Sequence, residues 1–237
     1  LSQWSRIHTP VTNRPQILTQ TRLKTFKRCA QLHHYSYELG IDVREKAPAL
    51  KFGIAAHECL EKLWTEGEIP RDIQGKYRQE LGVNNSAKLE AMMIGYDLFW
   101  EKEDMRIISV EREFSIPLRN PRTKGTSRTY SMCGKIDAIV SVGSNFYIVE
   151  HKTTNRDVSP GSQYWQRLTL DEQISFYIYG ARSLGFPVSG CIYDVLRKPT
   201  DRKLMTPEDK RKYRKDGKLY AAQRAEDEPI EDYKERL

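Results

Sequence analysis

The chain has 237 residues, of which 38% are hydrophobic, so it can bury one sizeable core, with or without an appendage. Its 39 basic and 32 acidic residues leave a net charge of +7, a moderate excess that is compatible with a polyanionic partner but is common without one. No apolar run approaches the roughly 18 residues that span a bilayer, and no signal peptide is visible at Leu1, so we expect a soluble protein with no membrane partner.

The four cysteines stand far apart, at positions 29, 59, 133 and 191, and none forms a CxxC pair. This spacing argues against a zinc or iron–sulfur site that the sequence would reveal, and nothing indicates a disulfide-stapled secreted domain. We therefore expect the protein to work in a reducing compartment.

The chain begins with a segment, residues 1–18, that contains two prolines and no periodicity, and it is interpreted as an irregular arm. A helix is predicted over residues 19–39, where three basic residues lie close together and rings follow them. These residues are Lys24, Lys27 and Arg28, and then His33, His34, Tyr35 and Tyr37. Two interpretations stay open: a solvated basic face, or a surface that contacts phosphates while its aromatic rings stack on bases.

A second helix is predicted over residues 50–65 from its apolar stripe. His57 and Glu61 are four residues apart, so they are neighbours on one face of this helix. A histidine beside an apolar stripe is more often a packed, hydrogen-bonded side chain than a ligand. The helical pattern resumes over residues 70–104, with an interruption at 81–85.

Residues 107–118 alternate between apolar and polar side chains as a strand does, with Glu111 and Glu113 on one of its two sides. Residues 119–128 contain proline, glycine and four basic residues, which indicates a flexible basic loop. This loop leads into the most informative stretch of the chain.

Residues 133–153 are predicted to form a β-hairpin, since two runs rich in β-branched and aromatic residues flank a turn at residues 143–144. A two-residue loop pairs Val142 with Asn145. Counting outward from that pair, Asp137 lies directly opposite Glu150, with Cβ atoms about 5 Å apart. The hairpin therefore brings two carboxylates together.

Period-two alternation places Lys152 on the same face as Glu150, so an ammonium joins the two carboxylates. Two acids and a lysine in this arrangement indicate a site for a hard cation. The alternative is an ordinary cross-strand charge cluster on a surface hairpin. The apolar composition of both strands favours the cation site, because a buried strand pair is an expensive place for idle carboxylates.

Residues 155–169 are predicted to be a loop that carries Tyr164 and Trp165, and residues 170–184 a helix with Gln173 and Tyr177 one turn apart. A further strand is predicted over residues 188–196. The order of helices, strand, hairpin, helix and strand is typical of a mixed α/β layer architecture. Residues 201–237 are interpreted as a charged, partly helical tail that follows a domain of residues 19–200.

Four of these features, in this order, resemble the PD-(D/E)XK nuclease superfamily, in its RecB-like branch, which includes phage-type exonucleases. They are the helical segment GIAAHECLE around His57, the strand segment GKID with Gly134 and Asp137, the segment Glu150-His151-Lys152, and Gln173 with Tyr177. The resemblance spans roughly residues 20 to 198. It implies a restriction-endonuclease-like α/β fold, with a mixed β-sheet core flanked by helices.

The resemblance also implies a site that binds Mg²⁺ or Mn²⁺ and hydrolyses phosphodiester bonds of DNA. The implied metal ligands are His57, Asp137, Glu150 and the backbone carbonyl of His151. The implied catalytic residues are Lys152, Glu150, Asp137, Gln173 and Tyr177. Glu61 is expected either to hold His57 through its other ring nitrogen or to lie on the helix surface. The residues expected to contact DNA are Lys24, Lys27, Arg28, Tyr164 and Trp165.

Some members of the branch hold an iron–sulfur cluster with one early cysteine and a later group of three, and only Cys29 matches that pattern, so no cluster is expected. The resemblance favours an exonuclease in the cytoplasm of a bacterial or phage-infected cell. A structure-specific or sequence-specific endonuclease on the same fold is the alternative, as is a DNA-binding or scaffold module that no longer cuts. The charged tail is a candidate surface for a protein partner.

Overall fold

The computed structural model describes residues 4–6, 16–43, 45–100, 104–204, 216 and 227–237. The chain divides into two compact units. The first consists of Leu1–Ala47, Asp104–His151 and Ser159–Asp194, and the second of Pro48–Glu103, Lys152–Val158 and Val195–Leu237.

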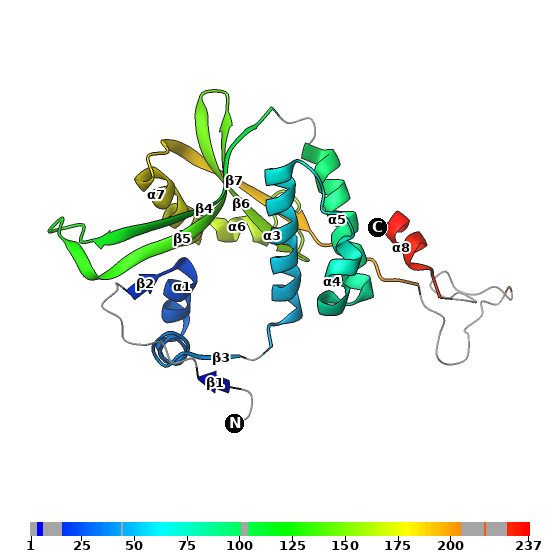
Figure 1. The fold of residues 1–237 in the computed structure, drawn as a ribbon, viewed down its shortest axis with the longest axis horizontal. Helices are drawn as coiled ribbons and strands as arrows, with labels where there is room; N and C mark the ends of the chain where they lie inside the picture. The colour runs from blue at the N-terminus through cyan, green and yellow to red at the C-terminus, as the bar shows by residue number, and fades with distance from the viewer. Residues whose placement is uncertain (1–3, 7–15, 44, 101–103, 205–215, 217–226) are drawn as a thin grey trace. The chain divides into compact units, whose positions relative to one another are not determined.

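A five-stranded mixed sheet organises the first unit (Figure 1). Its strands are β2 (Gln16–Leu18), β4 (Arg106–Arg119), β5 (Thr126–Val142), β6 (Asn145–Thr154) and β7 (Val188–Arg197). Strand β5 pairs antiparallel with β4 and β6 and parallel with β2. Because β4 occupies one edge of β5 at Ser131 and Met132, β2 lies on the other edge, which β6 occupies further along. The predicted fold class, a mixed sheet flanked by helices, is confirmed.

The hairpin of β5 and β6 forms as its sequence predicts. Gly143 has a φ of +58°, which suits a two-residue turn, and Val142 pairs with Asn145. Five apolar residues of these two strands are at most 1% exposed: Ile136, Ile139, Val140, Ile148 and Val149. Both the register and the burial of this strand pair are therefore confirmed.

The predicted helix over residues 19–39 is wrong at Cys29. The chain forms α1 (Gln20–Arg28), α2 (Ala30–His33) and a π-helical turn, η1 (His34–Glu38), and Cys29 between them is extended at φ −162°. The thiol of Cys29 accepts a hydrogen bond from the Leu32 amide and so begins α2. The end of the arm was also expected to be irregular, whereas residues 16–18 form β2. A separate antiparallel pair joins β1 (Trp4–Arg6) to β3 (Ile41–Val43).

Helix α7 (Glu172–Ser183) packs against strands β4 and β5, and it follows α6 (Gln163–Gln166) and η2 (Arg167–Leu170). The Asp171 side chain caps α7 by accepting from the Gln173 amide. Phe176 and Ala181 of this helix pack in one core with Phe114 of β4 and with apolar residues of β5 and β6. A Cβ on Gly180 would lie 2.5 Å from the Phe114 ring, so only glycine allows this close approach.

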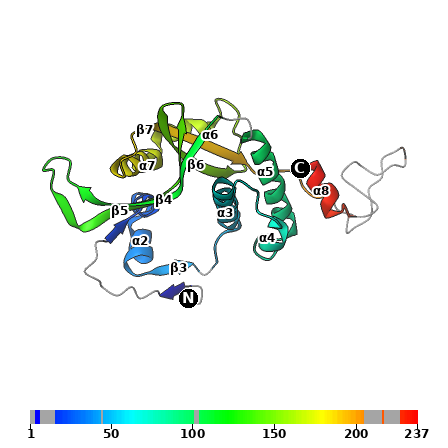
Figure 2. The ribbon, with the colours of Figure 1, turned by 45° about the horizontal axis from the view of Figure 1, so that its top comes forward.

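The second unit is built on three helices, α3 (Pro48–Glu66), α4 (Ile73–Leu81) and α5 (Val83–Trp100), which Figure 2 shows beside one another. The predicted interruption at 81–85 is the turn at Gly82, whose φ is +76°. Buried Trp64 donates a hydrogen bond to the hydroxyl of Tyr96 at 3.1 Å and so links α3 to α5.

The end of the predicted tail packs in this unit. Helix α8 (Ile230–Arg236) contacts α5, and its Tyr233 is fully buried. Lys234 of α8 lies 3.0 Å from the Glu90 carboxylate of α5. The remainder of the predicted tail lies outside the described residues, apart from 201–204, 216 and 227–229. None of the helices described above combines the length and the apolar character that crossing a membrane requires.

Candidate active site

Strands β5 and β6 place Asp137 and Glu150 side by side in the sheet. The ladder between them runs from Val142 opposite Asn145 to Ala138 opposite Val149. One further step in the same register brings Asp137 opposite Glu150. Asp137 is half-buried, whereas Glu150 is 2% exposed.

Both carboxylates accept hydrogen bonds that hold them in place. An oxygen of Asp137, Oδ2, accepts from the backbone amide of His151 at 2.8 Å. The Glu150 Oε1 atom accepts from the Gln173 side-chain amide of α7 at 2.6 Å. The family resemblance implied a catalytic role for Gln173, and in the structure its side chain contacts Glu150.

Tyr177 stands one turn after Gln173 on α7 and packs beside the same strands. Burial, followed by the negative charge of Glu150, raises the pKa of Tyr177 to about 12. Its ring explains the glycine of the GKID segment: a Cβ on Gly134 would lie 3.1 Å from Tyr177 and 2.8 Å from Phe114. Because its pKa is raised, the Tyr177 phenol stays protonated at neutral pH and is available as a hydrogen-bond donor.

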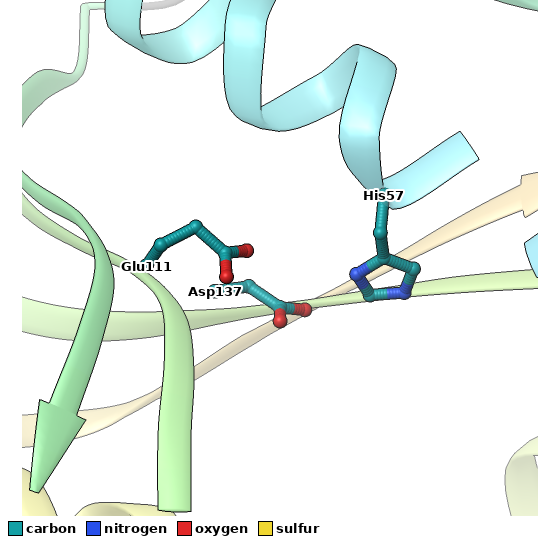
Figure 3. A group of neighbouring side chains, drawn as sticks. All are labelled: His57, Glu111 and Asp137. Atoms are coloured by element: carbon teal, nitrogen blue, oxygen red, sulfur yellow. The ribbon is translucent and has the colours of Figure 1, made fainter. Parts of the chain in front are cut away.

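Glu111 of β4 is a third acidic residue beside this pair, and the sequence analysis gave it no role. It lies between Val110, paired with Ala138, and Arg112, paired with Ile136, and so stands opposite Asp137. Carboxylate oxygens of Glu111 and Asp137 lie within 4.8 Å of each other. Figure 3 draws these two side chains with that of His57, which comes from α3.

The backbone of Glu111 is unusual, since its φ is +50° in a residue that is not glycine. Such a conformation costs on the order of 1–3 kcal/mol and tends to occur at functional sites. The Glu111 carboxylate also forms an ion pair with Lys135 of β5. Its alternation with Val110 was visible in the sequence, but its strand partner was not.

His151 contributes more than the backbone carbonyl that the sequence resemblance implied. Its ring is buried, and Nδ1 lies 2.9 Å from Oδ2 of Asp194 on β7. An ionised carboxylate can only accept, so Nδ1 is assigned as the protonated nitrogen. Asp194 is a second residue that sequence reasoning missed, because 43 positions separate it from His151.

Three of the expected site residues belong to the second unit. His57 is half-buried on α3, and Glu61 is exposed one turn further along that helix. Lys152 is half-buried on β6, two residues after Glu150.

The residues expected to contact DNA differ in exposure. Lys24 and Arg28 of α1 are exposed, and Lys27 forms an ion pair with Glu172 of α7. Tyr164 and Trp165 of α6 are half-buried and stack edge to face at 5.4 Å.

The mixed five-stranded sheet with its flanking helices defines an α/β protein of the restriction-endonuclease-like class. The model of the PD-(D/E)XK nuclease superfamily matches residues 17–237, and the chain belongs to this superfamily. Membership implies a nuclease that depends on a divalent metal and acts on DNA.

Among solved structures, the crystal structure of SSO0001 is similar at a TM-score of 0.26 and 13% identity, over 63% of this chain and 80% of that one. Among curated proteins, none matches this sequence.

Proposed function

We propose that this protein is a DNA exonuclease of the RecB-like branch, which hydrolyses phosphodiester bonds with Mg²⁺ or Mn²⁺. The observation that carries the proposal is the pair of carboxylates, Glu111 and Asp137, with oxygens within 4.8 Å, beside Glu150 in the next strand. Like charges this close are stable when a cation lies between them. The superfamily membership supports the same chemistry.

The proposed metal ligands are Asp137, Glu150, the backbone carbonyl of His151, and His57. To these we add Glu111, because of its distance to Asp137. Oxygen ligands suit a hard divalent cation, and an imidazole shifts the preference somewhat toward Mn²⁺. Glu61 as a hydrogen-bond partner of His57 stays a prediction.

When bound, the metal would polarise the scissile phosphate and lower the pKa of an attacking water. Lys152 would position that water or help to deprotonate it, and would stabilise the charge that develops on the phosphate oxygens. Gln173 holds the Glu150 carboxylate through its 2.6 Å hydrogen bond. Tyr177, protonated at neutral pH, would donate a hydrogen bond within the site.

The proposed DNA contacts are the basic residues of α1 and the rings of α6. Lys24, Lys27 and Arg28 would bind phosphates, and Tyr164 and Trp165 would contact bases. A protein partner for the C-terminal segment stays a prediction, and α8 is already packed against α5.

The test is a time course with end-labelled single-stranded and double-stranded DNA and with closed circular DNA, in Mg²⁺, Mn²⁺ or EDTA. An exonuclease shortens the linear molecules from one end, spares the circles and stops in EDTA. Nicked or linearised circles would instead establish an endonuclease. DNA binding without cleavage in either metal would place the protein among the non-cleaving modules.

Asp137→Ala and Lys152→Ala test the site itself. Each is expected to lower the cleavage rate by at least about a thousandfold, since each removes a group on which the reaction depends. Glu113→Ala is the matched control, because Glu113 is an exposed acid on β4. Substantial metal-dependent cleavage by folded Asp137→Ala or Lys152→Ala would contradict the site assignment.

A further inference from the structure

Three large aromatic side chains are exposed on neighbouring turns of the first unit. Phe26 of α1 is 55% exposed, and Tyr35 and Tyr37 of η1 are 41% and 37% exposed. We call these three residues the aromatic platform. Aromatic rings are costly to leave in water, so a group of them on one segment marks an interaction surface.

A buried arginine holds the segment that carries the platform. Arg22 is 8% exposed, and its guanidinium donates hydrogen bonds to four groups on three elements of the chain. The acceptors are Nε2 of His33 at 3.0 Å, the Ile17 carbonyl at 3.0 Å, Oε1 of Gln16 at 3.1 Å and Oε1 of Glu38 at 2.6 Å. Arg22 therefore ties α1, α2 and η1 to strand β2.

Two of the three rings pack against His33, which accepts a hydrogen bond from Arg22. His33 lies between two platform residues, with its ring centroid 5.3 Å from Phe26 and 5.2 Å from Tyr37. The Arg22 guanidinium lies 5.4 Å from the centre of the Tyr37 ring, and Gln31 donates to the Tyr35 hydroxyl at 2.8 Å. Rings that are already held lose little conformational entropy when they bind a partner.

The segment that carries the platform has a net positive charge. Residues 19–39 contain four basic residues, Arg22, Lys24, Lys27 and Arg28, and one acidic residue, Glu38, so their net charge is 4 − 1 = +3. Glu38 is ion-paired with Arg22, while Lys24 and Arg28 are exposed on α1. Exposed rings and exposed basic side chains on one segment are the two parts of a surface for single-stranded nucleic acid.

We propose that the aromatic platform binds single-stranded DNA by stacking on its bases, with Lys24 and Arg28 on the phosphates. A duplex keeps its bases stacked inside, so its outer surface offers these rings no base faces. The inference deepens the proposed function and rests on it, because it makes a single-stranded segment the form of DNA that this nuclease engages. The positive charge favours a polyanion over a protein as the occupant.

The test measures binding in EDTA, where no cleavage occurs, with a fluorescent oligothymidine and with a hairpin duplex of the same length. Phe26→Ala and Tyr35→Ala are each expected to weaken binding of the single strand about tenfold and binding of the duplex much less, as loss of one stacked base predicts. Tyr35→Trp, which keeps an aromatic ring, should bind the single strand as the wild type does. Tyr179→Ala is the matched control, since Tyr179 is a 45% exposed aromatic residue on α7.

A second readout separates stacking from charge. Joint replacement of Lys24 and Arg28 by glutamine should lower the slope of log affinity against log salt by about one to two, whereas Phe26→Ala should leave the slope unchanged. Equal single-strand affinity of wild type, Phe26→Ala and Tyr35→Ala, all with unchanged melting temperatures, would overturn the proposal and leave a protein as the occupant of these rings.

The two proposals fail in different assays. If the wild type cleaves DNA but the platform variants bind the single strand normally, the proposed binding role of the platform is refuted and the proposed nuclease activity is supported. If the wild type binds the single strand through the platform but cleaves no DNA, the proposed reaction is refuted and the proposed binding role of the platform is supported.

Discussion

Each acidic side chain of the candidate active site is held by a group from a neighbouring part of the chain. The Asp137 carboxylate accepts from the His151 amide, Glu150 from Gln173, and Glu111 is ion-paired with Lys135. Carboxylates that are already oriented lose less conformational entropy when a ligand binds. Precise placement of three acids is what a divalent cation requires of a protein.

The hydrogen bond between His151 and Asp194 extends this support to β7, and its loss makes a testable prediction. Asp194→Ala should lower both the Mn²⁺ affinity and the cleavage rate about 10- to 100-fold, as loss of an outer-sphere partner does. The Mn²⁺ affinity is measured by electron paramagnetic resonance. Asp194→Asn keeps an acceptor oxygen and should retain most of the affinity. The His151 ring locates the backbone carbonyl of the same residue, so Asp194 is a positioning residue.

A structural role alone would lower stability and leave the metal affinity of the folded fraction unchanged. Thermal unfolding of the metal-free Asp194→Ala variant therefore accompanies the titration. Wild-type Mn²⁺ affinity in that variant would refute the positioning role.

At the scale of elements, close approach of α7 to the sheet explains how Gln173 reaches Glu150. Gly134 of β5 and Gly180 of α7 both face the Phe114 ring, and a Cβ on either would lie within 2.8 Å of it. Phe114 is 4% exposed and packed in the core, so its ring has little room to move. The two glycines therefore set the distance between the helix and the strands that bear the acids.

Gly180→Ala is expected to lower the free energy of unfolding by about 1–3 kcal/mol, because the added methyl overpacks the core against Phe114. Gly95→Ala provides a control of opposite sign: Gly95 is exposed in α5 with nothing within 4 Å of an added Cβ, so alanine should stabilise by about 0.5–1 kcal/mol. Urea titration of both variants measures the difference. A stabilising Gly180→Ala would show that the helix can move away without cost.

At the scale of the whole molecule, the chain returns to the second unit at its C-terminal end. The Tyr233 ring of α8 is fully buried, and its hydroxyl donates a hydrogen bond to the Asp201 carbonyl at 2.8 Å. Burial raises the pKa of this hydroxyl, which keeps it protonated as a donor. The charge composition predicted a charged, partly helical tail here, and the described helix α8 packs its Tyr233 in a core.

Tyr233→Ala should therefore destabilise the protein by about 3–5 kcal/mol, as truncation of a buried aromatic side chain does. Tyr233→Phe loses only the hydrogen bond to Asp201, which contributes about 1 kcal/mol. Differential scanning calorimetry of the two variants gives both values. An unchanged transition in Tyr233→Ala would mean that α8 does not unfold together with the rest of its unit.

The sequence by itself determined the hairpin of β5 and β6, including the register that places Asp137 opposite Glu150, and the bounds of α7 to within two residues. These features are local. A two-residue turn fixes the pairing of the strands it joins, and a cap fixes where a helix begins.

Only the tertiary structure decided which distant residues join the hairpin. Glu111 meets Asp137 through the pairing of β4 with β5, and Asp194 meets His151 across 43 positions. Arg22 likewise joins strand β2 to α2 and η1, through groups that lie up to 16 positions away from it. Contacts between residues far apart in the chain are chosen by the packing of the whole core, and no periodicity in a single segment encodes them.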